Sequence, residues 1–249
     1  MNKYNKSSQK TGQGKLQGKI RFKFSKTGAY KYFSHLDIIS IISRAIRRAK
    51  IRVKYSEGFN PKPKMSFGPP TSLGIESYAE YGDIILADDL KPEDFLIRLN
   101  DALNNRLKIE KAVRVTYPVK SIMSQTDIIK YSINLDLHNI NKQEKKDILS
   151  ILTDLLSNKE DHISKGIYRF EEIENGVSSS QVVLNLYGYD KILKGIESKV
   201  FKFREFRLFL EGVLKELGID NIKIIKEELY ITCGERLINP FEILQETHR

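Results

Sequence analysis

Short stretches of this chain alternate apolar with charged residues, and between them lie longer stretches with apolar residues three or four positions apart. Near the start of the chain, for example, Ile20, Phe22 and Phe24 alternate with basic residues. Alternation with a period of two predicts a strand with one buried face, whereas spacing of three and four predicts an amphipathic helix. The order in which these two patterns follow one another constrains the fold more than any other property of the sequence.

The same order of elements is predicted twice, once in each half of the chain. Strand, helix, strand, strand, helix and strand are expected at 19–25, 35–50, 51–56, 82–87, 88–104 and 107–117, and again at 129–137, 142–156, 167–173, 181–187, 202–217 and 222–233. A βαββαβ unit forms a four-stranded antiparallel sheet with two helices on one face, the ferredoxin-like sandwich. The sequence therefore predicts an α+β protein of two tandem ferredoxin-like domains, 19–120 and 126–249, after a disordered basic tail at 1–18.

The first predicted helix has a marked start and a basic face. Ser34, followed three residues later by Asp37, predicts a helix start with a capping box. At about 100° per residue, isoleucines and alanines share one face of this helix, and Arg44, Arg47 and Arg48 share the opposite face. The first face is expected to pack into a core and the second to bind an anionic partner.

A loop rich in proline and glycine follows. The residues expected to shape it are Gly58, Asn60, Pro61 and Pro63. Gly and Asn tolerate a positive φ, and Pro restricts the backbone, so such a loop can keep one shape. Lys62 and Lys64 are expected at its surface. We predict that the loop folds back toward Ser34 and His35, so that its lysines and the helix arginines form one basic surface beside the helix N-terminus.

Four motifs in this region resemble those of a known family. Between Lys31 and Asp83 they read Y-F-S-H-L-D, R-A-I-R-R-A, Y-S-E-G-F-N-P-K-P-K-M-S-F and L-G-I-E-S, and they resemble the uncharacterised radical-SAM-linked domain family. That family occurs as free-standing proteins and as a C-terminal appendage of radical SAM, cobalamin-binding proteins, so the resemblance implies such a protein as a partner. The chain departs from the family pattern at Ser40, Ser43 and Ser72, where the family usually has Arg and Glu and often has Pro.

The positive charge of the chain is concentrated in its first half. Residues 1–124 hold 24 Lys and Arg against 11 Asp and Glu, whereas residues 125–249 hold 18 against 21. The net charge of +10 therefore comes entirely from the first half. Together with the arginine face and the loop lysines, this asymmetry predicts an anionic partner, and RNA in particular.

Strand alternation also predicts what the open face of the first sheet presents. If the apolar residues of 19–25 face the helices, Arg21 and Lys23 face the open side. No aromatic residue is predicted on that side, so we expect contacts to RNA phosphates rather than stacking on bases. The alternative is that the second domain or the tail covers this face.

Candidate catalytic chemistry is limited to one histidine. His35 is expected at a helix start, where the helix dipole lowers the pKa of an imidazole, and beside Tyr55, Ser56 and Lys62 it is a candidate general base toward a ribose hydroxyl. The alternative is a structural role for His35. The histidines are scattered and Cys233 is the single cysteine, so no metal site is predicted. The sequence also lacks a glycine-rich nucleotide-binding motif, so no cofactor is predicted.

These observations support three hypotheses. The first is a cytoplasmic accessory protein that presents a structured RNA to a radical SAM/cobalamin-binding partner. The second is a metal-independent enzyme that cleaves or modifies RNA with His35. The third is a protein-interaction domain that docks on a radical SAM partner without nucleic acid. A chain with one cysteine and no apolar run long enough to span a bilayer is expected in the cytoplasm. Catalysis is the less favoured hypothesis, because no base partner for His35 is identified.

Overall fold

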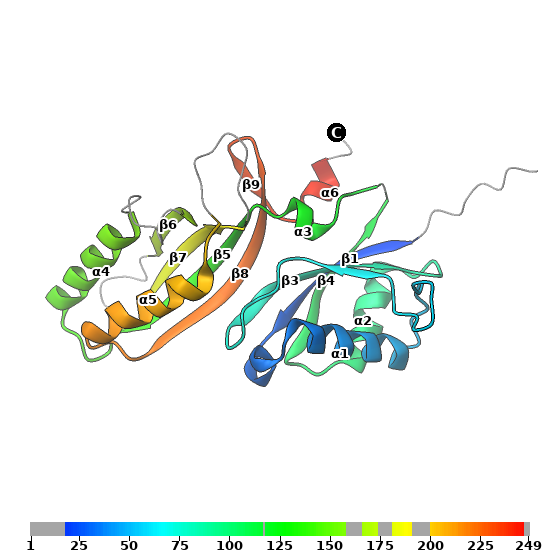
Figure 1. Ribbon diagram of the computed structural model, residues 1–249, viewed down its shortest axis with the longest axis horizontal. Helices are drawn as coiled ribbons and strands as arrows, with labels where there is room; N and C mark the ends of the chain where they lie inside the picture. Colours follow the sequence, from blue (N-terminus) through cyan, green and yellow to red (C-terminus); the bar gives the residue numbers. More distant parts are fainter. Residues whose placement is uncertain (1–17, 117, 158–165, 174–180, 191–199, 247–249) are drawn as a thin grey trace, which may run out of the picture.

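The computed structural model describes residues 18–116, 118–157, 166–173, 181–190 and 200–246. Its elements, in chain order, are β1 (Lys19–Lys26), η1 (Gly28–Tyr32), α1 (His35–Arg48), β2 (Met65–Phe67), β3 (Glu76–Ile85), α2 (Pro92–Ala102), β4 (Leu107–Val115), α3 (Ile122–Gln125), β5 (Ile128–Asp136), α4 (Lys142–Ser157), β6 (Ile167–Ile173), β7 (Gln181–Tyr189), α5 (Phe203–Glu216), β8 (Ile222–Cys233), β9 (Arg236–Ile238) and α6 (Ile243–Glu246). The predicted α+β class is confirmed (Figure 1). The predicted tail lies outside the described residues except for its last residue, Gly18.

The described strands belong to one mixed sheet. In the first half, β4, β1 and β3 lie side by side and antiparallel, and β2 pairs with the later part of β3. In the second half, the order is β8, β5, β7, β6, again antiparallel. The two halves join where β8 runs parallel to β3 at Glu76 and Ser77. The two sheets expected from the sequence are therefore connected, and their assignment to two tandem ferredoxin-like domains stays a prediction.

Each half has helices on one face of its strands (Figure 1). In the first half, Phe22 of β1 packs with Ile42 of α1 and Phe95 of α2 in one buried cluster. The core of the second half, built largely from strands and from helices α4 and α5, extends to Ala79 and Tyr81 of β3. The two cores thus meet along β3 and β8, which fixes the position of one half against the other. No helix in the described part of the chain combines the length and the apolar content that a membrane crossing requires.

The predicted strand at 51–56 is wrong. That segment forms only isolated bridges, from Val53 to Leu86 and from Tyr55 to Pro63, and the strand that pairs with β3 is the later Met65–Phe67. The sequence suggested a strand because apolar and basic residues alternate over 51–56, but this segment pairs only briefly, where the Lys54 amide donates to the Ile85 carbonyl and the Ala87 amide donates to the Arg52 carbonyl. β3 also begins at Glu76, six positions before the predicted start, since its first residues pair with β8 from the other half.

Candidate functional site

The first turn of α1 is occupied by its own capping residues. The Asp37 amide donates to Ser34 Oγ at 3.2 Å, and the Ser34 amide donates to the Asp37 carboxylate at 3.0 Å. Ser34 Oγ also donates to the Asp37 carboxylate at 2.6 Å, and this bond and the one from the Ser34 amide lower the pKa of Asp37, so the carboxylate is ionised at neutral pH. The capping box is confirmed, but a negative charge at the helix start disfavours a second anion. Phosphate binding at this N-terminus stays a prediction, and the charge of Asp37 weighs against it.

The basic face of α1 is confirmed. The apolar residues of the opposite face are buried, whereas Arg44, Arg47 and Arg48 are exposed. Arg48 also donates to the carbonyl of Ala102 at 2.7 Å, at the end of α2, so it has a structural contact as well. The helix therefore presents cationic side chains along its exposed side and into its last turn.

The chain after α1 forms a hairpin over residues 54–64. Tyr55 and Pro63 lie opposite each other in an antiparallel bridge, and the Lys64 amide donates to the Lys54 carbonyl at 2.7 Å. This register places Lys54 directly opposite Lys64, so their ammonium groups lie on the same face of the hairpin.

The tip of this hairpin is held by further hydrogen bonds. The Ser56 amide donates to the Lys62 carbonyl at 2.8 Å, and the Lys62 amide donates to Ser56 Oγ at 3.0 Å. Between them, Gly58 has a φ of 115°, which L side chains rarely adopt. The predicted role of Gly58 in shaping the loop agrees with this geometry, whereas Asn60 does not have a positive φ.

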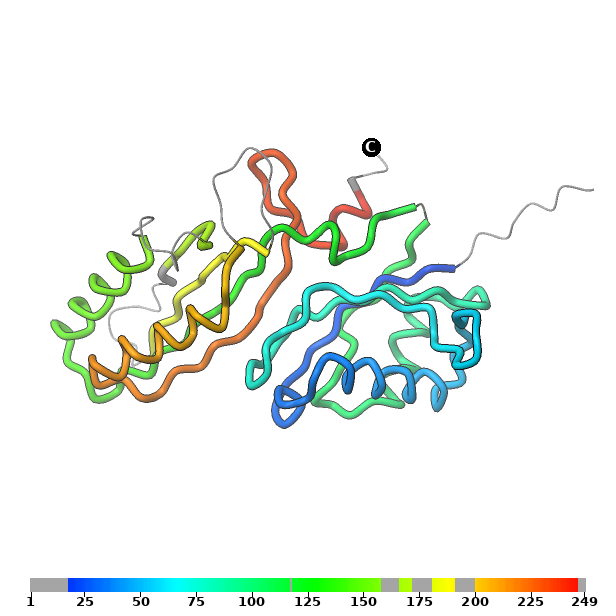
Figure 2. Tube along the Cα trace, viewed as in Figure 1, coloured from blue at the N-terminus to red at the C-terminus, as the bar shows by residue number. Residues whose placement is uncertain are grey.

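The hairpin lies at the C-terminal end of α1. It begins six residues after Arg48, and Figure 2 shows it beside the end of the helix rather than beside its start. The prediction that Lys62 and Lys64 fold back toward Ser34 is wrong, because only the chain beyond the hairpin returns there. We define the basic end of the first half as five exposed residues: Arg44, Arg47, Arg48, Lys62 and Lys64.

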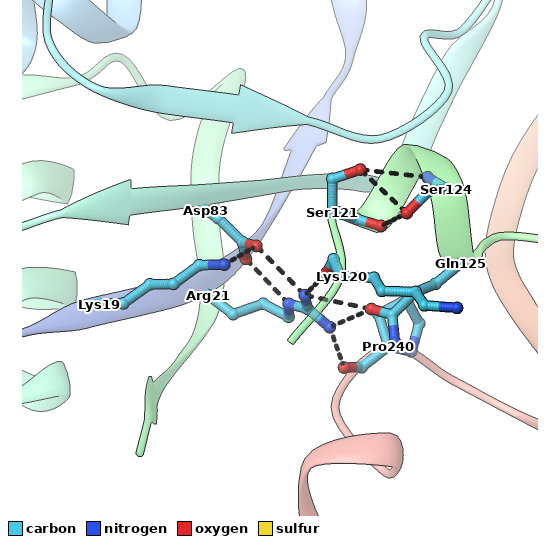
Figure 3. A network of polar contacts seen from close by, with 8 residues as sticks. All are labelled: Lys19, Arg21, Asp83, Lys120, Ser121, Ser124, Gln125 and Pro240. Carbon is cyan, nitrogen blue, oxygen red and sulfur yellow. Dashed lines mark hydrogen bonds and ion pairs between the residues drawn. The ribbon is translucent and has the colours of Figure 1, made fainter. Parts of the chain in front are cut away.

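Arg21 lies at the centre of a buried polar network (Figure 3). Its side chain has no exposed surface. Nε and Nη2 donate to the two oxygens of Asp83 at 2.8 and 3.1 Å, and Nη1 donates to the Pro240 carbonyl at 2.9 Å. Gln125 and Lys19 complete the network around the same groups. The expectation that Arg21 faces solvent and binds nucleic acid is wrong. The chain between Lys120 and Gln125 covers it from one side, and the C-terminal segment at Pro240 covers it from another.

Lys23, two residues further along β1, is also engaged across the two halves. Its Nζ lies 2.7 Å from a carboxylate oxygen of Glu228 in β8, and its side chain is 19% exposed. The Tyr81 hydroxyl donates to the other oxygen of Glu228 at 2.7 Å. The alternative stated above, that the second half covers this face, is therefore confirmed, and an open basic sheet face is not part of the candidate site.

A second buried ionic group lies where β3 meets β8. Glu80 accepts hydrogen bonds from Thr71 Oγ1, from Ser77 Oγ at 2.7 Å and from Lys226 Nζ at 3.1 Å. Lys226 has no exposed surface and also donates to the Pro69 carbonyl at 2.5 Å. Burial alone would raise the pKa of Glu80, but Lys226 and the two hydroxyls lower it overall. We call Glu80, Lys226 and the nearby Lys26 the β3–β8 charge cluster.

Lys26 is the uncompensated member of this cluster. It is 3% exposed, and its ammonium group forms no hydrogen bond and no ion pair with any described residue. Burial lowers the pKa of its ammonium group, Glu80 acts in the opposite direction, and Lys226 lowers the pKa further. A buried lysine of this kind costs stability while it is charged.

We therefore expect Lys26→Met to raise the free energy of unfolding by about 1 kcal/mol at pH 7. The sign follows from the lowered pKa: between that value and the ordinary lysine pKa of about 10.4, the unfolded chain binds more protons, so wild-type stability rises with pH. The advantage of the variant should shrink between pH 7 and pH 10 in urea unfolding. A variant less stable than the wild type at both pH values would contradict this, and Lys62→Met serves as the exposed control.

His35 lies beside the charge cluster and not beside the hairpin. Its ring is partly buried and meets the Phe67 ring edge-on at a centroid distance of 5.6 Å. Partial burial lowers the pKa of His35, Glu80 opposes this, and Lys226 and Lys26 lower it further. The direction is the predicted one, but its causes are burial and charge. Tyr55, Ser56 and Lys62 belong to the hairpin at the other end of α1, so the structure does not bring the proposed catalytic partners to His35.

Three carboxylates close in sequence have protein partners. Glu76 accepts from the Gly28 amide and pairs with Lys223, and Asp83 and Glu80 pair with the cations described above. In the described ranges, no group of three or more His, Cys, Asp or Glu residues is arranged to hold a metal ion. The basic end, the Arg21 network and the β3–β8 charge cluster therefore stand as three concentrations of charge in the described part of the chain.

The sequence matches a family model over residues 19–187, and the family is described as an uncharacterised protein conserved in bacteria (DUF2344). No curated protein matches the chain. Among solved structures, one described as a glycine cleavage system transcriptional repressor is 9% identical, with 85% of this chain and 99% of that chain covered and a TM-score of 0.25. DyPB from Rhodococcus jostii RHA1 is also 9% identical, with 85% and 93% covered and a TM-score of 0.21. Similarities this low carry no argument about this chain.

Proposed function

The chain belongs to the DUF2344 family of uncharacterised proteins conserved in bacteria, and we propose that it is an accessory protein that binds structured RNA through the basic end of its first half. The contacts would be made to phosphates, because exposed Arg and Lys side chains supply charge and donors without reading bases. The resemblance of its motifs also supports a radical SAM/cobalamin-binding protein as the partner to which the RNA is presented, and the single cysteine supports the cytoplasm as the location.

One observation carries the proposal, namely the contrast between paired and unpaired cations in the first half. Arg21, Lys23 and Arg52 pair with carboxylates, of Asp83, Glu228 and Asp88 respectively. At the basic end, by contrast, Arg44, Arg47, Lys62 and Lys64 form no ion pair with any residue of the described ranges. Like charges gathered at one end without ion-pair partners repel one another, and an anionic partner relieves that repulsion.

The strand order of the two halves indicates the role of the second half. Both halves follow the βαββαβ order, with strand orders β4-β1-β3-β2 and β8-β5-β7-β6. This supports the proposal of two tandem ferredoxin-like units, divided near α3 into residues 19–120 and 126–249. In that arrangement the second unit covers the sheet face of the first through β8 and the C-terminal segment. The first unit is left with its helix side and its hairpin end to bind RNA.

We expect the double variant Arg47→Glu/Lys62→Glu to weaken RNA binding by a similar factor for many RNA sequences. Each lost phosphate contact should also lower the slope of log affinity against log salt by about 0.7 to 0.9. The measurement is a set of binding titrations with a folded bacterial RNA at several salt concentrations.

The matched control is Arg204→Glu/Lys215→Glu, which reverses one exposed arginine and one exposed lysine on α5 of the second half. The control should change affinity and slope little. Equal losses in both double variants would mean that net charge alone drives binding, and no measurable RNA binding by the wild type would refute the proposed function.

A further inference from the structure

The most exposed large apolar side chain in the described part of the chain is Phe59, at the tip of the hairpin over residues 54–64. Its relative exposure is 108%. Tyr55 on the same hairpin is 42% exposed, whereas Met65 and Phe67, in the strand that follows, pack against the core of the first half. A single apolar residue at the surface is ordinary, but a phenyl ring fully in water at a loop tip contributes nothing to the stability of the fold. Its place is therefore explained by something outside the fold.

The hairpin holds Phe59 in a fixed position. One backbone hydrogen bond links the two arms at Lys54 and Lys64 and another at Ser56 and Lys62, and Pro61 and Pro63 restrict the returning arm. A loop whose flanking backbone is already ordered loses less conformational entropy when it binds. The hairpin thus presents a ring whose faces are accessible and whose backbone is fixed before any partner arrives.

The charges around Phe59 indicate the chemistry of that partner. Lys54 lies directly opposite Lys64, an arrangement of like charges that destabilises an antiparallel pair, and Lys62 follows on the same arm. Glu57 is the one carboxylate on the hairpin, and it precedes the tip. An apolar pocket of a protein would not neutralise three ammonium groups. A nucleic-acid strand offers both a flat base for the ring and phosphates for the lysines.

We propose that Phe59 stacks on an unpaired RNA base while Lys54, Lys62 and Lys64 contact the neighbouring phosphates. This rests on the proposed function and narrows it: the RNA taken by the basic end has an accessible single-stranded loop or end. Stacking is tolerant of sequence because every base has an aromatic face, so the hairpin selects unpaired bases rather than a particular base.

The test compares Phe59→Leu, Phe59→Trp and wild type on two probes, a single-stranded oligouridine and a blunt RNA duplex of the same length. Phe59→Leu keeps the apolar volume but removes the aromatic face. It should weaken oligouridine binding roughly 5- to 150-fold, the size of one base–aromatic stack. Phe59→Trp should retain binding. Duplex affinity and the salt slope should stay unchanged, because no charge is removed.

The matched control is Tyr32→Leu, which removes another exposed aromatic ring, 68% exposed, in η1 just before the start of α1. It should leave both affinities unchanged. The inference is overturned if Phe59→Leu binds oligouridine as the wild type does, if Tyr32→Leu causes the same loss, or if Phe59→Leu loses affinity for oligouridine and duplex equally. If Phe59→Leu bound both RNAs as the wild type does but no longer bound a protein partner, the Phe59 ring would be assigned to protein docking instead. Failure of the wild type to bind either RNA would refute the proposed function itself, so the two failures are distinguishable.

Discussion

Arg21→Met should lower the free energy of unfolding by about 3 to 5 kcal/mol, because it leaves the Asp83 carboxylate buried with only Lys19 as a counter-charge. The arginine has no exposed surface, and Asp83 is 2% exposed. Its guanidinium also donates to the Pro240 carbonyl, so the variant removes a contact that ties the C-terminal segment to β1. The measurement is urea unfolding at pH 7.

Two further variants separate the buried pair from a general effect of removing arginine. Arg52→Met breaks an ion pair with Asp88 in which the arginine is 76% exposed, and it should cost far less stability than Arg21→Met. Arg21→Met/Asp83→Leu replaces the whole buried pair by apolar groups and should recover most of the loss. If Arg21→Met lost less unfolding free energy than Arg52→Met, the Arg21 network would not hold the two halves together.

Lys226→Met is expected to cost about 3 to 5 kcal/mol for the same physical reason. The change leaves Glu80 buried with two hydroxyl donors and the unbonded Lys26. Because the pKa of Glu80 is lowered in the folded wild type, the stability contributed by its carboxylate is present above the ordinary Glu pKa of about 4.3 and is lost as pH falls through the lowered value. The gap between wild type and variant should therefore be largest near neutral pH and narrow under acid.

Lys223→Met is the matched control for this prediction. Lys223 lies on the same strand and also pairs with a glutamate of β3, Glu76, at 2.8 Å, but its side chain is 58% exposed. Removal of such a surface pair should cost no more than about 1 kcal/mol. Equal losses for Lys223→Met and Lys226→Met would contradict the idea that burial makes the β3–β8 charge cluster decisive.

The local parts of the fold could be predicted from the sequence. The capping pair of Ser34 and Asp37 fixes the start of α1, and the periodicity of its apolar residues separates its buried and basic faces. Both signals act within a few residues, so neighbouring sequence is enough to show them.

The parts that the sequence did not reveal depend on distant contacts. Alternation in β1 correctly separates Arg21 from the apolar face, but it does not tell what covers the other side. The covering Pro240 lies 219 residues away. Likewise, Glu80 and Lys226 are 146 residues apart, and neither stands in a local pattern that marks it as buried.

The hairpin shows a third limit of local patterns. Alternation over 51–56 is typical of a strand, but β3 takes its partners from Met65–Phe67 and from β8. The proline-rich segment forms a separate hairpin at the end of α1, because it does not supply a regular partner strand for β3. The length of this loop would let it fold either toward the start of α1 or away from it, so length alone could not predict that the hairpin lies at the end of the helix.

Hydrogen–deuterium exchange with and without a bound folded RNA tests the central claim, the location of the RNA site, most directly. The account predicts that RNA slows exchange in the last turns of α1 and in residues 54–64, while α4 and α5 of the second half exchange as before. Protection confined to the second half, or RNA binding without protection at the basic end, would contradict it.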